Sequence, residues 1–265
     1  MSAELLLARV LKCTRIELYL QFERILTAEE RRAYRELIHR RAAREPVQYI
    51  LGETEFMGIP IRVTPAVLIP RPETEMLVDS VIEYAREAAC PLRILDIGTG
   101  SGCIAIALAK MIPEAMVTAI DISNEALEIA VANARLNNAE VTFLAGDIFQ
   151  IYRELPRPLD IVVSNPPYIS QDDWEQLQPE VKNYEPASAL QGGDDGMDFY
   201  RRLAKVVQEL LAPQGALFLE TGYNQARAVA ELFEAINFQT LIRPDLNQIE
   251  RVVIARRGKV EGDKG

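Results

Sequence analysis

The stretch Leu92–Gly102, LRILDIGTGSG, decides the fold. Its first half has the length and composition of a buried strand, and its second half is a glycine-rich loop that opens a helix. The same rhythm continues downstream, with strands predicted at 92–97, 115–121, 140–145, 159–164, 214–221, 250–255 and near 238–243, and helices at 102–111, 124–137, 196–212 and 223–236. Buried strands that alternate with helices predict an α/β fold, with a mostly parallel sheet covered on both faces.

Residues suited to ligand binding follow four of these strands directly. Gly98, Asp121, Asp147 and Asn165 each come just after a predicted strand. Ligands of parallel α/β sheets bind beyond the carboxyl ends of the strands. We therefore expect these four residues to line one crevice, although they are far apart in the sequence.

The first 72 residues follow a different pattern. Apolar stripes at 5–11 and 18–26 predict helices, and the capping box Thr27–Glu30 opens another helix that runs to about Ala43. A β-hairpin is predicted around the turn Gly58-Ile59-Pro60, with strands at 55–57 and 61–63. We expect four parts: an N-terminal helical domain at 1–50, a β-hairpin linker at 51–72, the α/β domain at 73–257 and a frayed tail at 258–265.

The composition limits the classes of function. The 265 residues carry a formal net charge of −10, which argues against direct binding of nucleic acid through its phosphates. The arginine-rich run at 31–44 is interpreted as a solvated helix face. Three cysteines without a C-x-x-C pair, and a single histidine, predict a reduced cytoplasmic protein with no metal site. No apolar run approaches the ~20 residues that span a bilayer, so we expect no membrane partner. We also expect a monomer.

The glycine loop favours one class of cofactor. Its three glycines allow a tight turn and close backbone approach to a ligand. A dinucleotide loop needs G-x-G-x-x-G, whereas here the third glycine comes one place early and Cys103 stands where it should be. Asp96, at the end of the strand, suits a cofactor that bears a positive charge. The sequence therefore favours S-adenosylmethionine over a dinucleotide.

Two acidic residues have predicted roles toward that cofactor. Asp121 can accept hydrogen bonds from both ribose hydroxyls, or it can help to cap the following helix with Ser123. Asp147 can bond the adenine amino group while Ile148 covers the ring, or it is an ordinary turn aspartate. The predicted cofactor-binding residues are Gly98, Thr99, Gly100, Ser101, Gly102, Asp121, Asp147, Ile148 and Asn165.

The most specific motif is Asn165-Pro166-Pro167-Tyr168. An amide or aromatic amino nitrogen is a poor nucleophile because its lone pair is delocalised. The Asn165 side-chain oxygen and the Pro166 carbonyl can hold both N–H groups, orient the lone pair toward a sulfonium methyl and spread the developing charge. The prolines stiffen the loop, and Tyr168 is expected to form a flat wall against a planar group. We predict methylation of a planar nitrogen, with Asn165, Pro166 and Tyr168 catalytic and Asn165, Pro166, Pro167 and Tyr168 substrate-binding.

With these motifs the chain resembles the PrmC/HemK family of class I S-adenosylmethionine-dependent methyltransferases. Further likeness lies in Pro46–Gly52 (PVQYILG), Leu68–Glu75 (LIPRPETE) and Glu185-Pro186-Ala187, so that it covers roughly residues 40–255. The resemblance implies a Rossmann-like, mostly parallel seven-stranded sheet and a small N-terminal helical domain that binds the substrate. It also implies methyl transfer from S-adenosyl-L-methionine, which becomes S-adenosyl-L-homocysteine. The implied acceptor is the side-chain nitrogen (N5) of the glutamine in the Gly-Gly-Gln loop of class 1 peptide chain release factors. Ile148 departs from the tryptophan of some members.

Three alternatives remain open on the residues alone. Glutamine methyltransferases of a ribosomal protein share Asn-Pro-Pro-Tyr but look different after the Pro-Arg pair, where this chain has Pro72–Glu75. N6-adenine or N4-cytosine methyltransferases of nucleic acids share it too, but the acidic charge and the lack of a basic recognition domain argue against them. A non-catalytic S-adenosylmethionine-binding subunit is disfavoured by the intact catalytic motif. The loop at 185–196 is predicted either to form a lid or to cap the next helix.

Overall fold

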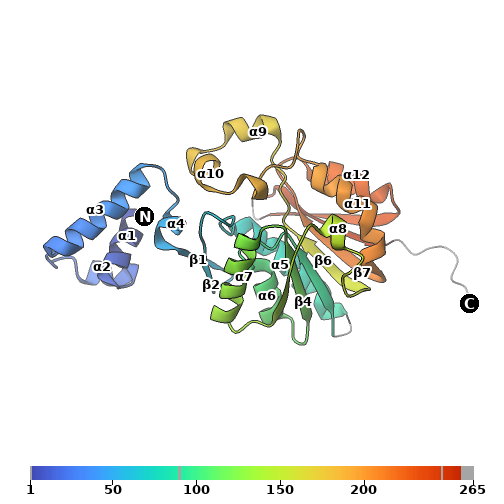
Figure 1. Cartoon of the computed structure of the whole chain (residues 1–265), viewed down its shortest axis with the longest axis horizontal. Coiled ribbons are helices and arrows are strands. Elements are labelled where there is room, and N and C mark those ends of the chain that lie inside the picture. Colours follow the sequence, from blue (N-terminus) through green and yellow to red (C-terminus); the bar gives the residue numbers. More distant parts are fainter. Residues whose placement is uncertain (1, 89–90, 246, 258–265) are drawn as a thin grey trace, which may run out of the picture.

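The N-terminal part of the chain forms a helical lobe. In this computed structural model, which describes residues 2–88, 91–245 and 247–257, the lobe stands at one end of the molecule (Figure 1). Its helices are α1 Ser2–Leu11, α2 Arg15–Leu20, α3 Ala28–Ala42 and α4 Val47–Leu51. The predicted capping box at Thr27 and Glu30 is present, and Thr14 and Glu17 form a second one. None of the 15 residues of α3 is buried, which agrees with the interpretation of the arginine-rich run as a solvated face.

A hairpin of β1 Glu53–Phe56 and β2 Ile59–Arg62 connects this lobe to the sheet domain. Its turn consists of Met57 and Gly58, with φ of 51° and 74°, as a two-residue type I′ turn requires. The predicted turn at Gly58-Ile59-Pro60 was therefore wrong, because Ile59 and Pro60 lie in β2. The physical reason is burial: Ile59 and Ile61 point into the core and alternate with exposed Pro60.

The main domain contains a seven-stranded sheet with the order β5-β4-β3-β6-β7-β9-β8. All pairs are parallel except those that β9 makes with β7 and β8. The strands are β3 Arg93–Ile97, β4 Met116–Asp121, β5 Val141–Ala145, β6 Leu159–Ser164, β7 Leu211–Glu220, β8 Phe238–Pro244 and β9 Glu250–Arg257. The predicted α/β fold with a mostly parallel seven-stranded sheet is confirmed.

Helices cover both faces of this sheet, and each face has its own apolar core. One face carries α5 Pro72–Glu87, α6 Cys103–Met111 and α7 Asn124–Leu136, and the other α8 Ile148–Ile151, α11 Asp198–Leu210 and α12 Ala226–Glu234 (Figure 1). Ile94 packs into the first core and its neighbour Leu95 into the second, because successive strand residues point to opposite faces. Phe56 and Ile61 of the hairpin belong to the first core, so the hairpin is fixed to the domain.

The segment after β6 contains short helices that the sequence did not predict. These are α9 Gln171–Gln176, α10 Pro179–Tyr184 and the 3-10 helix η1 Ala187–Ala189. Glu180 of α10 forms ion pairs of 2.9 Å with both Arg41 and Arg44, and the Tyr184 hydroxyl donates to the Ala43 carbonyl at 2.6 Å. Helix α10 therefore joins the helical lobe to the sheet domain (Figure 1).

Membrane spans and metal clusters can be considered only over the described part of the chain. Within those ranges, no helix is long and apolar enough to cross a membrane. The same residues contain no group of three or more His, Cys, Asp or Glu side chains arranged to hold a metal ion. The predicted tail at 258–265 lies outside the described residues.

Candidate active site

A cavity of about 220 Å³ lies at the carboxyl ends of β3, β4, β5 and β6. The parallel strands bring the four segments that the sequence singled out to this one edge of the sheet. Of the predicted site residues, its walls include Gly98, Gly100, Asp121, Asp147, Ile148, Asn165 and Pro167. Thr99, Ser101, Gly102, Pro166 and Tyr168 do not line it.

The glycine loop uses its three left-handed residues in two different ways. Gly98, Gly100 and Gly102 have φ of 72°, 55° and 81°. A Cβ on Gly98 or Gly100 would meet no atom within 4 Å, so the backbone there faces open space. A Cβ on Gly102 would lie 3.1 Å from the Cβ of Ala130. Gly102 therefore permits close packing of α7 against the start of α6, and not the close approach to a ligand that we expected.

Asp96 supports the loop from within the protein. It is fully buried and does not line the cavity, in contrast to the expectation that it faces the cofactor. Its Oδ2 accepts a hydrogen bond of 2.6 Å from the Thr99 hydroxyl, while Oδ1 has no partner among the residues described. Burial raises the pKa of Asp96 to about 7, despite the opposing hydrogen bond from Thr99. Asp96 thus fixes the loop through Thr99.

The carboxylate of Asp121 is bound to the backbone of the glycine loop and to the start of the loop after β4. Oδ2 accepts from the Gly100 amide at 2.8 Å, and Oδ1 accepts from the Ser123 amide at 2.9 Å. Ser123 itself caps α7 through its own side chain. Each carboxylate oxygen retains a second lone pair, so hydroxyl groups in the cavity can still donate to Asp121.

The far wall of the cavity combines an ion pair with aromatic rings. Asp147 caps α8 by accepting from the Phe149 amide at 3.0 Å, and it pairs with Arg202 at 3.0 Å. The Arg202 guanidinium lies 3.9 Å from the centroid of the Phe149 ring, and Phe199 packs edge-on against that ring. Ile148 is buried, with 4% exposure, and contributes apolar surface. The residues that line the cavity from helices rather than from strand ends were not predicted from the sequence: Phe149, Phe199 and Arg202.

The linker and the segment after the catalytic motif close the opposite side. Lining residues come from Ala66–Leu68 and from Pro186–Ala189. Glu185 joins these two segments, because its carboxylate, whose side chain is 1% exposed, binds Arg71 at 2.5 Å and accepts from the Ile69 amide at 3.2 Å. The Pro-Arg-Pro-Glu stretch is therefore tied to the cavity wall through Arg71.

Asn165 lines the cavity directly after the end of β6, beside Thr74 of α5. Its Nδ2 donates to the Thr74 hydroxyl at 3.0 Å. The carboxyl of Glu220, at the end of β7, is buried nearby; burial raises its pKa, and Thr74 and Asn165 act in the opposite direction. The sequence analysis missed Glu220, although the signal was available: a polar residue directly follows the apolar run of a strand, as at Asp121 and Asn165.

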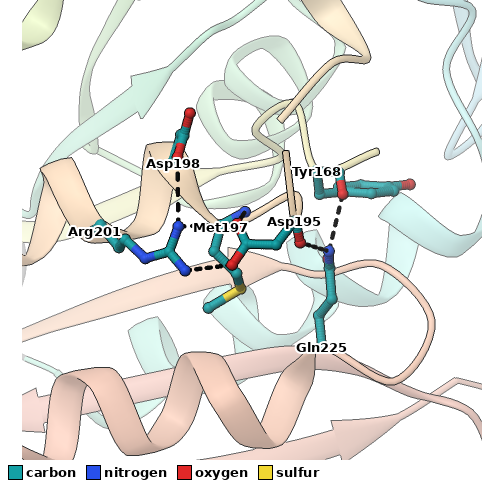
Figure 2. Close-up of polar contacts among 6 residues, drawn as sticks. All are labelled: Tyr168, Asp195, Met197, Asp198, Arg201 and Gln225. Carbon is teal, nitrogen blue, oxygen red and sulfur yellow. Dashed lines mark hydrogen bonds and ion pairs between the residues drawn. The ribbon is translucent and has the colours of Figure 1, made fainter. Parts of the chain in front are cut away.

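The rest of the catalytic motif is held by the loop at 185–196 and by Gln225. Figure 2 shows the Gln225 side-chain amide directed at the Tyr168 carbonyl, to which it donates at 2.9 Å. Its oxygen accepts from the Gly222 amide at 3.0 Å. Asp195, whose carbonyl lies 3.5 Å from the same nitrogen, pairs with Arg201 of α11 (Figure 2). Gln225 and the acidic loop therefore fix the backbone of the motif.

Close backbone packing completes this arrangement. Ile169 donates to the Leu190 carbonyl at 2.8 Å, and Gly192 donates back to the Ile169 carbonyl at 2.9 Å. A Cβ on Gly192 would lie 2.8 Å from the Pro167 carbonyl oxygen. The loop at 185–196 thus supports the backbone of the motif, while its two predicted roles, a lid or a cap of the next helix, stay predictions. Tyr168 packs against the second core and does not line this cavity, so its role as a flat wall for a planar group stays a prediction.

The fold and the site together define a class I S-adenosylmethionine-dependent methyltransferase. Family models match at two places: the PrmC N-terminal domain at residues 1–52 and the methyltransferase small domain at residues 74–180. A methyltransferase of Pyrococcus furiosus, 18% identical with a TM-score of 0.55, covers 86% of this chain and 98% of its own and shows the fold alone.

Two relatives are much closer in sequence. The release factor glutamine methyltransferase of Koribacter versatilis is 48% identical over 97% of this chain and 91% of its own length. That of Geobacter sulfurreducens is 45% identical over 97% of this chain and 89% of its own length. The chain belongs to the release factor glutamine methyltransferase family.

Proposed function

We propose that this protein methylates the side-chain nitrogen (N5) of the glutamine in the Gly-Gly-Gln loop of class 1 peptide chain release factors. The observation that carries the proposal is the Asn165 amide at the base of the cavity, whose NH₂ group is bound to Thr74. Its oxygen is thereby left to accept a hydrogen bond from a planar nitrogen. Nearly full-length similarity to enzymes named for this activity supports the choice of substrate.

The residues present fit the methyl donor. S-adenosyl-L-methionine supplies an electrophilic methyl group and leaves as S-adenosyl-L-homocysteine. Gly98 and Gly100 offer backbone with open space in front of it, and Asp121 offers acceptors for the ribose hydroxyls. Ile148 provides apolar cover for the adenine ring, while Asp147 must share its carboxylate between the adenine amino group and Arg202. Thr99, Ser101 and Gly102 act by shaping the loop.

Catalysis in this proposal depends on orientation. The glutamine amide nitrogen is weakly nucleophilic because its lone pair is delocalised into the carbonyl. Asn165 Oδ1 and the Pro166 carbonyl accept its two N–H groups, which directs the lone pair at the methyl group and stabilises the charge that develops. Pro167 and Tyr168 hold this geometry by fixing the loop. The amide becomes acidic as it gains the methyl group, so the proton is lost late, without a dedicated base.

The N-terminal helices are proposed to bind the release factor. Arg31, Arg32 and Arg35 on α3 are exposed and form a positive face on an otherwise acidic protein. Exchanging all three for serine should raise KM for the release factor and leave the affinity for S-adenosylmethionine unchanged. Arg86→Ser, an exposed arginine on α5, is the matched control. An unchanged KM in the triple variant would exclude this face as the binding surface.

The proposed reaction is tested by a panel of methyl acceptors. The enzyme is incubated with methyl-labelled S-adenosylmethionine and one acceptor at a time: a class 1 release factor, ribosomal protein, DNA or RNA. We expect label only in the release factor, and none when the glutamine of its Gly-Gly-Gln loop is replaced by alanine. Label in nucleic acid or ribosomal protein alone would overturn the assignment. We also propose that the enzyme acts in the cytoplasm and that it is a monomer. Light scattering can check the oligomeric state.

A further inference from the structure

Glu220 is a buried carboxyl for which the reaction as described has no use. It ends β7 with 2% exposure, and its Oε2 has no hydrogen-bond partner among the residues described. A buried carboxyl with an unsatisfied oxygen is costly, because the group loses its hydration without full compensation. Such a residue beside the catalytic motif calls for a functional explanation.

The surroundings of Glu220 determine what the Asn165 amide can do. The NH₂ group of Asn165 has two hydrogens, of which Thr74 Oγ1 accepts one at 3.0 Å. Thr74 and Asn165 both lower the pKa of the buried Glu220 carboxyl, which identifies that carboxyl as a further acceptor on the same side. Because Thr74 and Glu220 offer acceptors on the side away from the cavity, the Asn165 amide must turn Nδ2 toward them and Oδ1 toward the cavity. A flipped amide would place its oxygen against a carboxylate oxygen and offer only N–H groups to the substrate.

We propose that Glu220 is a positioning residue, whose ionised carboxylate acts with Thr74 to hold Asn165 with Oδ1 facing the substrate. The inference deepens the proposed function and rests on it for the identity of the substrate. Glu220 does not line the cavity, so it acts through Asn165 and touches no reacting atom.

The charge of Glu220 can change near neutral pH. Burial raises its pKa to about 7, against the lowering effect of the hydrogen bond from Thr74. Arg251 from β9 also lowers this pKa, whereas Glu73 from α5 raises it. Burial raises the pKa of Tyr168 and of Tyr200, and the charge of Glu220 adds to both shifts; Tyr200 donates its hydroxyl to the Glu220 backbone carbonyl at 2.8 Å. Protonation turns the acceptor into a donor, for which the flipped Asn165 amide is the better partner.

The first test compares the pH dependence of turnover in wild type and Glu220→Gln. We expect wild-type kcat to fall as the pH drops through about 7, and the variant to lose this acid limb. Because glutamine lacks the charge that selects one amide orientation, kcat of the variant at about pH 8 should fall by on the order of tenfold. Affinity for S-adenosylmethionine should stay close to wild type, and the melting temperature should not fall, because the variant replaces a carboxyl whose ionisation is disfavoured by burial. An unchanged acid limb together with unchanged kcat would overturn the proposal.

A second pair of variants keeps the proposal testable if Glu220→Gln does not fold. Thr74→Val removes the hydroxyl with little change of shape, and Thr74→Ser restores it. We expect kcat to fall in Thr74→Val and to recover in Thr74→Ser, whereas equal kcat in both would contradict the network.

A third measurement does not depend on the protein substrate. The side-chain NH₂ signals of Asn165 in the ¹⁵N spectrum should titrate near pH 7 in wild type and not in Glu220→Gln. An absent titration in wild type refutes the positioning role. Failure of the wild-type enzyme to methylate the glutamine, with the titration present, refutes the proposed function instead.

Discussion

Replacing Asp121 by alanine should weaken binding of S-adenosylmethionine by about 10- to 100-fold. The carboxylate accepts backbone hydrogen bonds at 2.8 Å from Gly100 and 2.9 Å from Ser123, and keeps a lone pair on each oxygen for the ribose hydroxyls. Loss of hydrogen bonds to a charged acceptor costs roughly 1.5–3 kcal/mol. At about 1.4 kcal/mol for each factor of ten, this cost corresponds to the predicted loss of affinity.

Titration calorimetry with S-adenosylmethionine and with S-adenosylhomocysteine measures the effect. Only S-adenosylmethionine carries the sulfonium charge, but both ligands carry the ribose. Because Asp121 is expected to bind the ribose, Asp121→Ala should weaken the binding of both ligands to a similar extent. Glu125→Ala is the matched control, since it removes the same charge from an exposed position outside the cavity. Unchanged affinity in Asp121→Ala would remove this residue from the ribose site. If Glu125→Ala weakened cofactor binding equally, the role of Asp121 would be reduced to long-range electrostatics.

Three further predictions concern turnover and stability. Asn165→Ala should lower kcat by on the order of 10²–10³-fold with little change in cofactor affinity, and wild-type turnover at saturating substrate would refute the mechanism. Gly102→Ala should destabilise the fold more than Gly98→Ala in denaturant titrations: both carry the cost of about 1–2 kcal/mol for a left-handed residue, but only Gly102 also presses against Ala130. Equal losses would contradict the packing argument. The pKa of Asp96 rises from 3.8 to about 7 on folding, so wild-type stability should fall as pH increases from about 4 to 7. Asp96→Asn, which cannot ionise, should gain stability relative to wild type as the pH rises from about 4 to 7, and a constant difference in melting temperature over this range would refute this.

The sheet domain could be predicted because its signals are long. Strands of five or more residues, such as 159–164, mostly alternate with helices of at least nine residues, and each pattern is unambiguous at that length. The misses are short or local. Helices α4, α9 and α10 have five or six residues, too few for a helical period to appear. The hairpin turn was misplaced because Gly58 and Pro60 are both turn formers, and only burial of Ile59 decides between them.

The candidate site could be predicted in part for a geometric reason. Parallel strands end at the same edge of the sheet, so the order of strands and loops in the sequence was enough to place Gly98, Asp121 and Asn165 together. Glu220 was missed although it ends the apolar run of a strand, as Asp121 does. Gln225 was missed because it reaches the site only through the backbone of Tyr168. Contacts between segments distant in sequence leave no local pattern, and they depend on how the loops after β6 and β7 pack together.

The central claim is that one glutamine side chain of a release factor receives the methyl group. The most direct measurement is tandem mass spectrometry of the Gly-Gly-Gln peptide after reaction of a purified class 1 release factor with the enzyme and S-adenosylmethionine. The account predicts fragment ions that place a single methyl group on the side-chain nitrogen of that glutamine. A methyl group on a lysine, an arginine or another residue, with this glutamine unmodified, would contradict it.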